Sequence, residues 1–244
     1  MSNHSSASPE RELLLLPGLM CDQTFWKPLL AKPLPGVTCR VVDYGDADTL
    51  TAMAQAALAA APPVFSLAGH SMGGRVALEV VRLAPERVER LILMDTGQLA
   101  RAPGEKGEAE KAGRLALLAI AEKDGVRAMA SEWVKGMVHP DRLGDARLIE
   151  DIVTMFERKT AARFARQQNA LLSRPDGSPV LVSLKAPCMV LCGWQDAWAN
   201  VAQHQAIQAL VPHASLAVIE DAGHMVLMEK PEPTIQAIEA FMNK

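Results

Sequence analysis

Six short apolar runs, separated by segments of helical character, constrain the fold of this chain more than any other feature. Helices are predicted over 49–61, 72–84, 200–211 and 233–244. The apolar runs are ELLLL (12–16), VTCRVV (37–42), VFSLA (64–68), RLILMD (90–95), CMVLC (188–192) and SLAVI (215–219). They lack strict alternation, which is typical of strands buried on both faces of a parallel sheet. The order of strands and helices therefore predicts an α/β fold, with a mostly parallel central sheet covered by helices on both faces.

The alternation of strand and helix stops between residues 97 and 180. This segment opens with the charged sequence RAPGEKGEAEKAG and continues with two long amphipathic stretches that show no strand pattern. The turn sequence RPDGSP closes it. We therefore expect a core made of residues 11–96 and 181–244, a helical insertion at 97–180, and a flexible tail at 1–10.

Composition narrows the class of protein and its environment. The 244 residues suit one domain with an insertion, and the net charge of -3 does not indicate a nucleic-acid partner. No apolar run approaches the length of a membrane span, and the polar N-terminus lacks a secretory pattern. The four cysteines form no CxxC pair, and the histidines and carboxylates lack metal-ligand spacing. We expect a cytoplasmic protein with reduced thiols and without a metal, a cofactor or a membrane partner.

The sequence GHSMGG (69–74) lies directly between a predicted strand and a predicted helix. In that context G-x-S-x-G is typical of a sharp turn that lifts its serine above the edge of the sheet. Gly69 and Gly73 avoid the clashes that larger side chains would cause there. Ser71 is therefore the predicted nucleophile, at a helix N-terminus whose partial positive charge favours an oxyanion. A purely structural glycine turn is the alternative.

A serine hydroxyl needs a general base, and that base needs an orienting acid. His224 lies between the last predicted strand and the last helix, at the end of the sheet where sites gather. His213 is the weaker candidate for the base. Asp196 follows the fifth predicted strand and gives the chain order serine, acid, histidine. Asp95, at the end of the fourth strand, is the competing acid.

Two backbone N–H groups are expected to hold the oxyanion. One belongs to Met72, the residue after the nucleophile. The second belongs to the loop after the first predicted strand, where Leu19 is the first candidate and Met20 the next.

Together these motifs resemble the α/β-hydrolase superfamily, in particular its serine esterases and lipases with a helical cap. The resemblance rests on LLLLPGLM, AGHSMGGRVALEVVRLAPERVERLILMDT, LCGWQDAWAN and DAGHMVLMEKPEPTIQAIEAF. The chain carries Pro17-Gly18 where many members carry His-Gly, and Ala199-Asn200 where many carry a proline after the acid. The resemblance implies that the insertion is a cap that selects the substrate.

A substrate pocket under this cap is expected to be lined by side chains from both lobes: Met20, His70, Trp133, Met137, Phe156, Trp198 and Met225. A basic stretch also lies in the insertion: Arg158, Lys159, Arg163 and Arg166. Such a stretch is usually a solvated face. The alternative is a docking site for an acidic carrier protein.

The activity expected from these residues is hydrolysis of small carboxylic esters, with Ser71, His224 and Asp196 as the triad. The same triad can serve lactone opening, carbon–carbon bond hydrolysis or cofactor-free lyase chemistry. A receptor-like protein that binds a ligand with little turnover is an alternative from another class. The sequence makes no prediction of oligomeric state.

Overall fold

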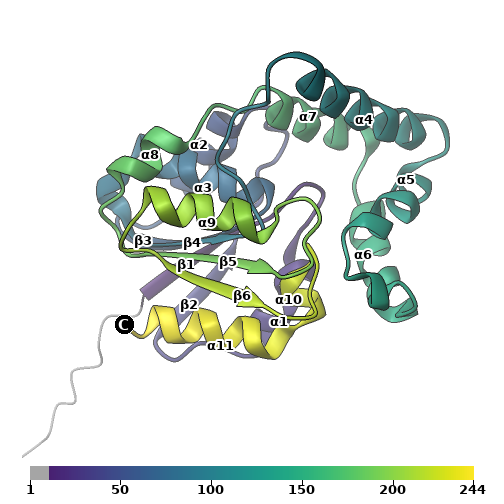
Figure 1. The fold of residues 1–244 in the computed structure, drawn as a ribbon. Helices are drawn as coiled ribbons and strands as arrows, with labels where there is room; N and C mark the ends of the chain where they lie inside the picture. Colours follow the sequence, from purple (N-terminus) through teal and green to yellow (C-terminus); the bar gives the residue numbers. More distant parts are fainter. Residues whose placement is uncertain (1–10) are drawn as a thin grey trace, which may run out of the picture.

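The computed structural model describes residues 11–244, and a six-stranded parallel sheet forms its centre (Figure 1). The expected tail at 1–10 lies outside the described residues. The strands are β1 (Arg11–Leu16), β2 (Val37–Val41), β3 (Phe65–His70), β4 (Val88–Met94), β5 (Cys188–Gly193) and β6 (Ser215–Ile219), in the order β2-β1-β3-β4-β5-β6. All six predicted strands are present, with ends shifted by at most two residues. The predicted fold class is confirmed.

Helices cover both faces of the sheet (Figure 1). One face carries α2 (Leu50–Ala60), α3 (Met72–Leu83), α8 (Ser178–Ser183) and α9 (Val201–Leu210). The other carries α1 (Gln23–Ala31), the short α10 (Val226–Glu229) and α11 (Pro231–Met242). The sequence pattern did not predict α1, whose interior contains Pro28. Asp22 caps this helix by accepting a hydrogen bond from the backbone N–H of Thr24 at 2.8 Å.

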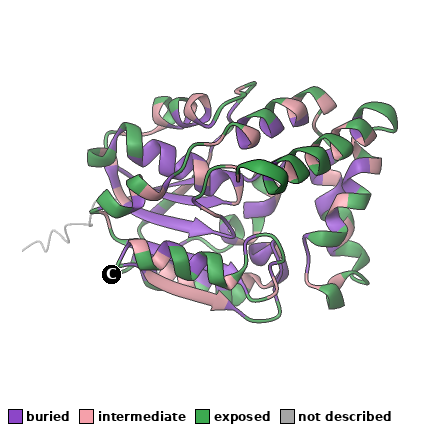
Figure 2. Cartoon of the chain, turned by 45° about the horizontal axis from the view of Figure 1, so that its top comes forward, coloured by how far each residue is buried: buried purple, intermediate pink, exposed green. Residues whose placement is uncertain are grey.

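The core lies in the sheet and along its helix contacts. Residues 13–16 of β1 are all completely buried, as a strand between two helical layers requires. Figure 2 shows the inner strands as buried and the edge strand β6 as mainly intermediate. Within residues 11–244, no helix is both long and apolar enough to cross a bilayer.

Four longer helices separate β4 from β5: α4 (Gly104–Lys123), α5 (Val126–Trp133), α6 (Ala146–Glu157) and α7 (Ala161–Leu172). Residues 97–180 contain no strand. Figure 1 shows these helices as an arch on the side to which the arrows of β5 and β6 point. We call α4–α7 and their connecting turns the cap. Helix α8 begins at residue 178, before the expected boundary at 181, and packs on α3 and α9 of the core.

The strand order places a topological switch point between β1 and β3. From β1 the chain continues to β2 on one side, and from β3 it continues to β4 on the other. In open α/β sheets, ligands bind beyond the carboxyl ends of the strands at such a point. The loop after Leu16 and the turn at Ser71 both begin there.

Candidate active site

The turn after β3 holds Ser71 in a backbone conformation that few residues adopt. Ser71 has φ 54° and ψ -115°, and its N–H donates to the carbonyl of Met94 at 2.8 Å. A Cβ added to Gly73 would lie 2.0 Å from the carbonyl oxygen of Leu16, and one added to Gly69 would lie 2.4 Å from that of Gly73. Only glycine therefore fits on either side of the serine. The strained backbone has the geometry predicted from GHSMGG.

The side chain of His224 bridges Ser71 and Asp196. Its Nε2 lies 2.9 Å from Ser71 Oγ, and its Nδ1 lies 2.8 Å from Asp196 Oδ2. An ionised carboxylate can only accept, so Nδ1 carries the proton and donates it to Asp196. Nε2 is then free to accept from the hydroxyl of Ser71. The sequence separated these three residues by 125 and 28 positions, and the fold brings them into one hydrogen-bonded series.

Asp196 is held in its charged form despite its burial. Burial acts to raise the pKa of this carboxyl group, but the charge and hydrogen bond of His224 and two backbone N–H donors outweigh it. The pKa is lowered to about 2. The two donors belong to Trp198 and Ala199, whose N–H groups lie 2.8 and 3.0 Å from Oδ1. One carboxylate oxygen is thus fixed by the loop and the other orients the imidazole.

The loop that carries His224 is fixed by a buried carboxylate and by the cap. Glu229 accepts the N–H groups of Gly223 at 3.0 Å, Met225 at 3.1 Å and His139 at 2.7 Å. The N–H of His224 itself donates to the carbonyl of Met137 at 2.7 Å. Met137 and His139 belong to the cap, so part of the support for His224 comes from outside the core.

The competing acid, Asp95, does not contact the His224 ring. Its Oδ1 accepts the N–H of Gly193 at 2.9 Å, and its Oδ2 has no hydrogen-bond partner. Complete burial and the neighbouring charge of Asp196 raise the pKa of Asp95 well above its usual value. The nearest cationic partner would be His70 Nε2 at 3.9 Å, but burial lowers the pKa of His70 to about 3. His70 instead donates to the carbonyl of His224 at 2.9 Å.

The two expected oxyanion donors lie on the same cavity as Ser71. Leu19 and Met72 line it together with Ser71. Met72 is the first residue of α3, where a helix leaves its N–H groups without an intrahelical partner. The second candidate, Met20, is different: its N–H donates to Gln167 Oε1 of the cap at 2.8 Å. Leu19 is therefore the better placed of the two.

This cavity has a volume of about 460 Å³, which is the size of an ordinary small-molecule site. The expected pocket residues that line it are His70, Trp133, Met137, Phe156, Trp198 and Met225. Met20 is the exception, since its completely buried side chain is not part of the lining. The rings of Trp133 and Trp198 stack at 5.7 Å, and Trp198 lies 5.0 Å from the ring of His224.

Comparison with known proteins identifies the family. The model of the alpha/beta hydrolase family matches residues 13–237. The chain belongs to this family. An esterase from Thermogutta terrifontis has a similar structure, with a TM-score of 0.84, 26% identity, and coverage of 97% of this chain and 91% of that one.

Two curated relatives illustrate how varied this hydrolase family is. One is the dihydrolipoyllysine-residue acetyltransferase component of the acetoin cleaving system of Pseudomonas putida, 31% identical over 88% of this chain and 56% of the relative. The other is a pimeloyl-acyl-carrier-protein methyl ester esterase of Aromatoleum aromaticum, 28% identical over 78% of this chain and 79% of the relative. The chain spans only 56% to 65% of the length of the first four curated relatives that it matches.

The basic stretch of the cap faces acidic residues of the core. Arg158 and Lys159 both bind Asp22, with nitrogen–oxygen distances of 2.9 and 2.7 Å. The other two cations of the stretch pair with the core loop after β2, Arg163 with Asp43 and Arg166 with Asp46. The charges considered for carrier docking therefore already have partners within the chain. We call these pairs the ionic seam between cap and core.

Sequence reasoning missed a polar wall of the cavity. It consists of Arg75 on α3, Glu110 and Arg114 on α4, and Gln168 on α7. Arg75 directly follows the glycines of the turn and could have been singled out on that ground. Nothing in the sequence indicates that Arg114 and Gln168, 54 positions apart, hydrogen-bond at 2.8 Å. Within residues 11–244, no group of three histidine, cysteine or acidic side chains has the arrangement of a metal site.

Proposed function

We propose that this protein hydrolyses small carboxylic esters through an acyl-enzyme formed on Ser71. The observation that carries the proposal is the series Ser71–His224–Asp196, with contacts of 2.9 and 2.8 Å. The cavity at Ser71 supports it, because an ester must reach the hydroxyl under the cap. The esterase names among the relatives also support it.

The residues suggest a two-step reaction. Ser71 Oγ attacks the ester carbonyl while His224 Nε2 takes the hydroxyl proton, and the N–H groups of Leu19 and Met72 stabilise the oxyanion. His224 then gives that proton to the departing alcohol, which leaves an acyl group on Ser71. A water molecule repeats the attack with His224 as the base and releases the acid. Asp196 stays ionised and stabilises the imidazolium in both steps.

Covalent labelling with a fluorophosphonate, followed by intact mass, tests the nucleophile. We expect one adduct on the wild type and turnover of p-nitrophenyl esters from acetate to octanoate. The Ser71→Ala variant should show no adduct, and its rate should fall by roughly 10⁴-fold or more. Ser131→Ala is the matched control, because this serine is exposed on α5 and bonds only its own helix at Arg127.

Other results would redirect the proposal. An adduct on Ser71 without ester turnover would favour the related acyl chemistries, which a panel of enol-lactones and vinylogous diketo acids separates. No adduct and no turnover, in a folded protein that binds a ligand tightly, would favour the receptor-like reading instead.

A further inference from the structure

The polar wall of the cavity holds more positive than negative charge. Three arginines, Arg75, Arg114 and Arg174, interact electrostatically with one carboxylate, Glu110. Arg75, Arg114 and Glu110 line the cavity, and Arg174 does not. An excess of buried charge is costly unless something pairs with it. These arginines therefore need negative partners, either from the chain or from a ligand.

Glu110 is fully engaged by two of the three arginines. Its Oε1 accepts from Arg114 Nε at 2.9 Å and from Arg174 Nη1 at 2.7 Å, and its Oε2 accepts from Arg174 Nη2 at 2.8 Å. Burial acts to raise the pKa of Glu110, but these arginines lower it to about 2. The group supplies one negative charge, and its hydrogen bonds go to Arg114 and Arg174 rather than to Arg75.

Of these three arginines, Arg75 is the one that forms no ion pair or hydrogen bond with a carboxylate among residues 11–244. Its guanidinium donates a hydrogen bond from Nη1 to an uncharged acceptor, the carbonyl of Leu99, at 2.8 Å. Burial, together with the charges of Arg174 and Arg114, lowers the pKa of Arg75 to about 9. The side chain is therefore still a cation at neutral pH. It lies four positions after Ser71, which is about 6 Å along the axis of α3.

Gln168 adds an unmatched donor to the same wall. Its Oε1 accepts from Arg114 Nη1 at 2.8 Å. Because a guanidinium only donates, this bond fixes which end of the amide is oxygen. The remaining Nε2 is buried and has no partner, and the side chain is only 2% exposed. An unpaired buried donor in a cavity points to an acceptor on the ligand.

We propose that Arg75, Arg114 and Gln168 bind a carboxylate of the substrate. The preferred substrates are then anionic esters, such as monoesters of dicarboxylic acids. This inference rests on the proposed ester hydrolysis at Ser71. A carboxylate offers acceptors to Arg75 and to Gln168 Nε2, and it balances the excess charge of the wall.

The rest of the cavity suits the hydrocarbon chain that joins the carboxylate of such a substrate to its ester group. Its lining includes the apolar side chains of Leu117, Trp133, Phe156 and Leu171 from the cap. Arg75 belongs to the core, whereas Arg114 and Gln168 belong to the cap. A bound carboxylate therefore contacts both lobes while the ester lies at the nucleophile.

The test compares two esters of nearly the same shape. Monomethyl adipate carries a carboxylate where methyl adipamate carries a neutral amide. We expect wild-type kcat/KM to be roughly 10- to 100-fold higher for monomethyl adipate, the range for hydrogen bonds to a charged group. In Arg75→Gln and Arg114→Gln this ratio should fall toward one, and Arg75→Lys should restore part of it.

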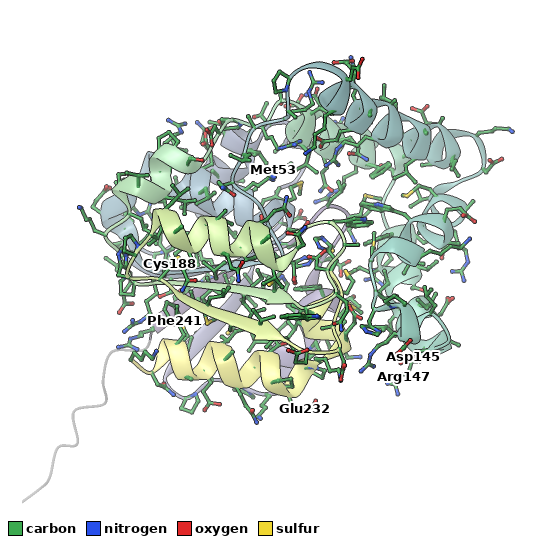
Figure 3. All side chains as sticks on the ribbon, in the orientation of Figure 1. Met53, Asp145, Arg147, Cys188, Glu232 and Phe241 are labelled. Carbon is green, nitrogen blue, oxygen red and sulfur yellow. The ribbon has the colours of Figure 1, made fainter. Side chains whose placement is uncertain are left out.

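Two further variants keep the test decisive. Arg147→Gln removes an exposed arginine from cap helix α6, which Figure 3 labels at the end of the cap, and it should keep the wild-type ratio. Gln168→Glu places a carboxylate beside Arg114. We expect this variant to fold, and its new carboxylate to compete with that of the substrate. This variant should prefer methyl adipamate.

The inference and the proposed function fail in different ways. If the wild type cleaves both esters equally well, or the arginine variants keep the preference for monomethyl adipate, the carboxylate subsite is wrong while ester hydrolysis stands. If no ester is cleaved, the proposed function is wrong. Calorimetric titration of Ser71→Ala with adipate then still decides the subsite: binding that Arg75→Gln abolishes supports it, and no binding overturns it.

Discussion

Two buried aspartates near Ser71 have pKa values shifted in opposite directions because their partners differ. Asp196 receives two backbone N–H groups and the imidazole of His224, and these keep its pKa low. Asp95 has backbone interactions from Gly193 and Val226 but no cationic partner, so burial and the charge of Asp196 raise its pKa. Both follow a strand of the same sheet. The sequence alone therefore favours Asp196 only through chain order, and the hydrogen bonds explain the difference.

The raised pKa of Asp95 predicts how stability depends on pH. The folded state keeps the proton of Asp95 at a pH where the unfolded state, with a pKa of about 3.9, has lost it. The unfolded state thus binds fewer protons, so Asp95 makes the free energy of unfolding fall as pH rises above about 4. Asp95→Asn removes this dependence and retains an oxygen for the N–H of Gly193. Urea unfolding should show a larger stability gain over wild type at pH 8 than at pH 5.

An equal difference at the two pH values would contradict a protonated Asp95. Asp176→Asn is a suitable comparison, because hydrogen bonds from Ser178 lower rather than raise the pKa of that exposed carboxyl group.

At the level of elements, the close contacts of the turn between β3 and α3 require glycine at both flanking positions. The predicted strands and the helices around Ser71 follow from apolar runs and from G-x-S-x-G, signals that lie within single segments. Helix α1 was missed because Pro28 interrupts its helical pattern. Its N-cap, Asp22, does not stand out in the sequence as the start of a helix. The role of Glu229 was also missed, since one of its three N–H partners, His139, lies 90 positions away in the chain.

Replacing two helical glycines by alanine should have opposite effects. In Gly73→Ala the new Cβ would lie 2.0 Å from the carbonyl oxygen of Leu16, so we expect loss of folding or of activity. In Gly113→Ala, within α4, the Cβ meets nothing within 4 Å. Alanine should therefore stabilise the protein by roughly 0.5–1 kcal/mol, the usual difference between the two residues in a helix. Thermal unfolding measures the stability of both variants. A lower melting temperature for Gly113→Ala would contradict the prediction that a Cβ at this position meets no neighbouring atom.

On the scale of the whole molecule, the cap is attached to the core by opposite charges. The ionic seam joins Arg158 and Lys159 to Asp22, while α7 reaches the loop after β2 through Arg163 and Arg166. The basic stretch is recognisable as a group in the sequence, but its partners are not. The acids lie more than 110 positions away and are separated from one another in the chain.

Reversing charge in the seam should loosen α7. Exposed ion pairs contribute only about 0–1 kcal/mol each, so we expect Arg163→Glu with Arg166→Glu to leave the fold intact. Hydrogen exchange of residues 161–172 should become faster, and added Asp43→Lys and Asp46→Lys should slow it again. Arg147→Glu is the control on the exposed part of the cap. Unchanged exchange in the double variant would show that contacts other than the ionic seam hold α7.

The bond from the N–H of His224 to the carbonyl of Met137 has a consequence for how such proteins can diversify. A cap transplanted from another family member would give the cavity a different lining. It would also have to place a backbone carbonyl where that of Met137 now accepts the N–H of His224. Residues 137–139 should therefore be kept together with the His224 loop in any recombination experiment. The interchangeable portion of the cap is smaller than its sequence boundaries indicate.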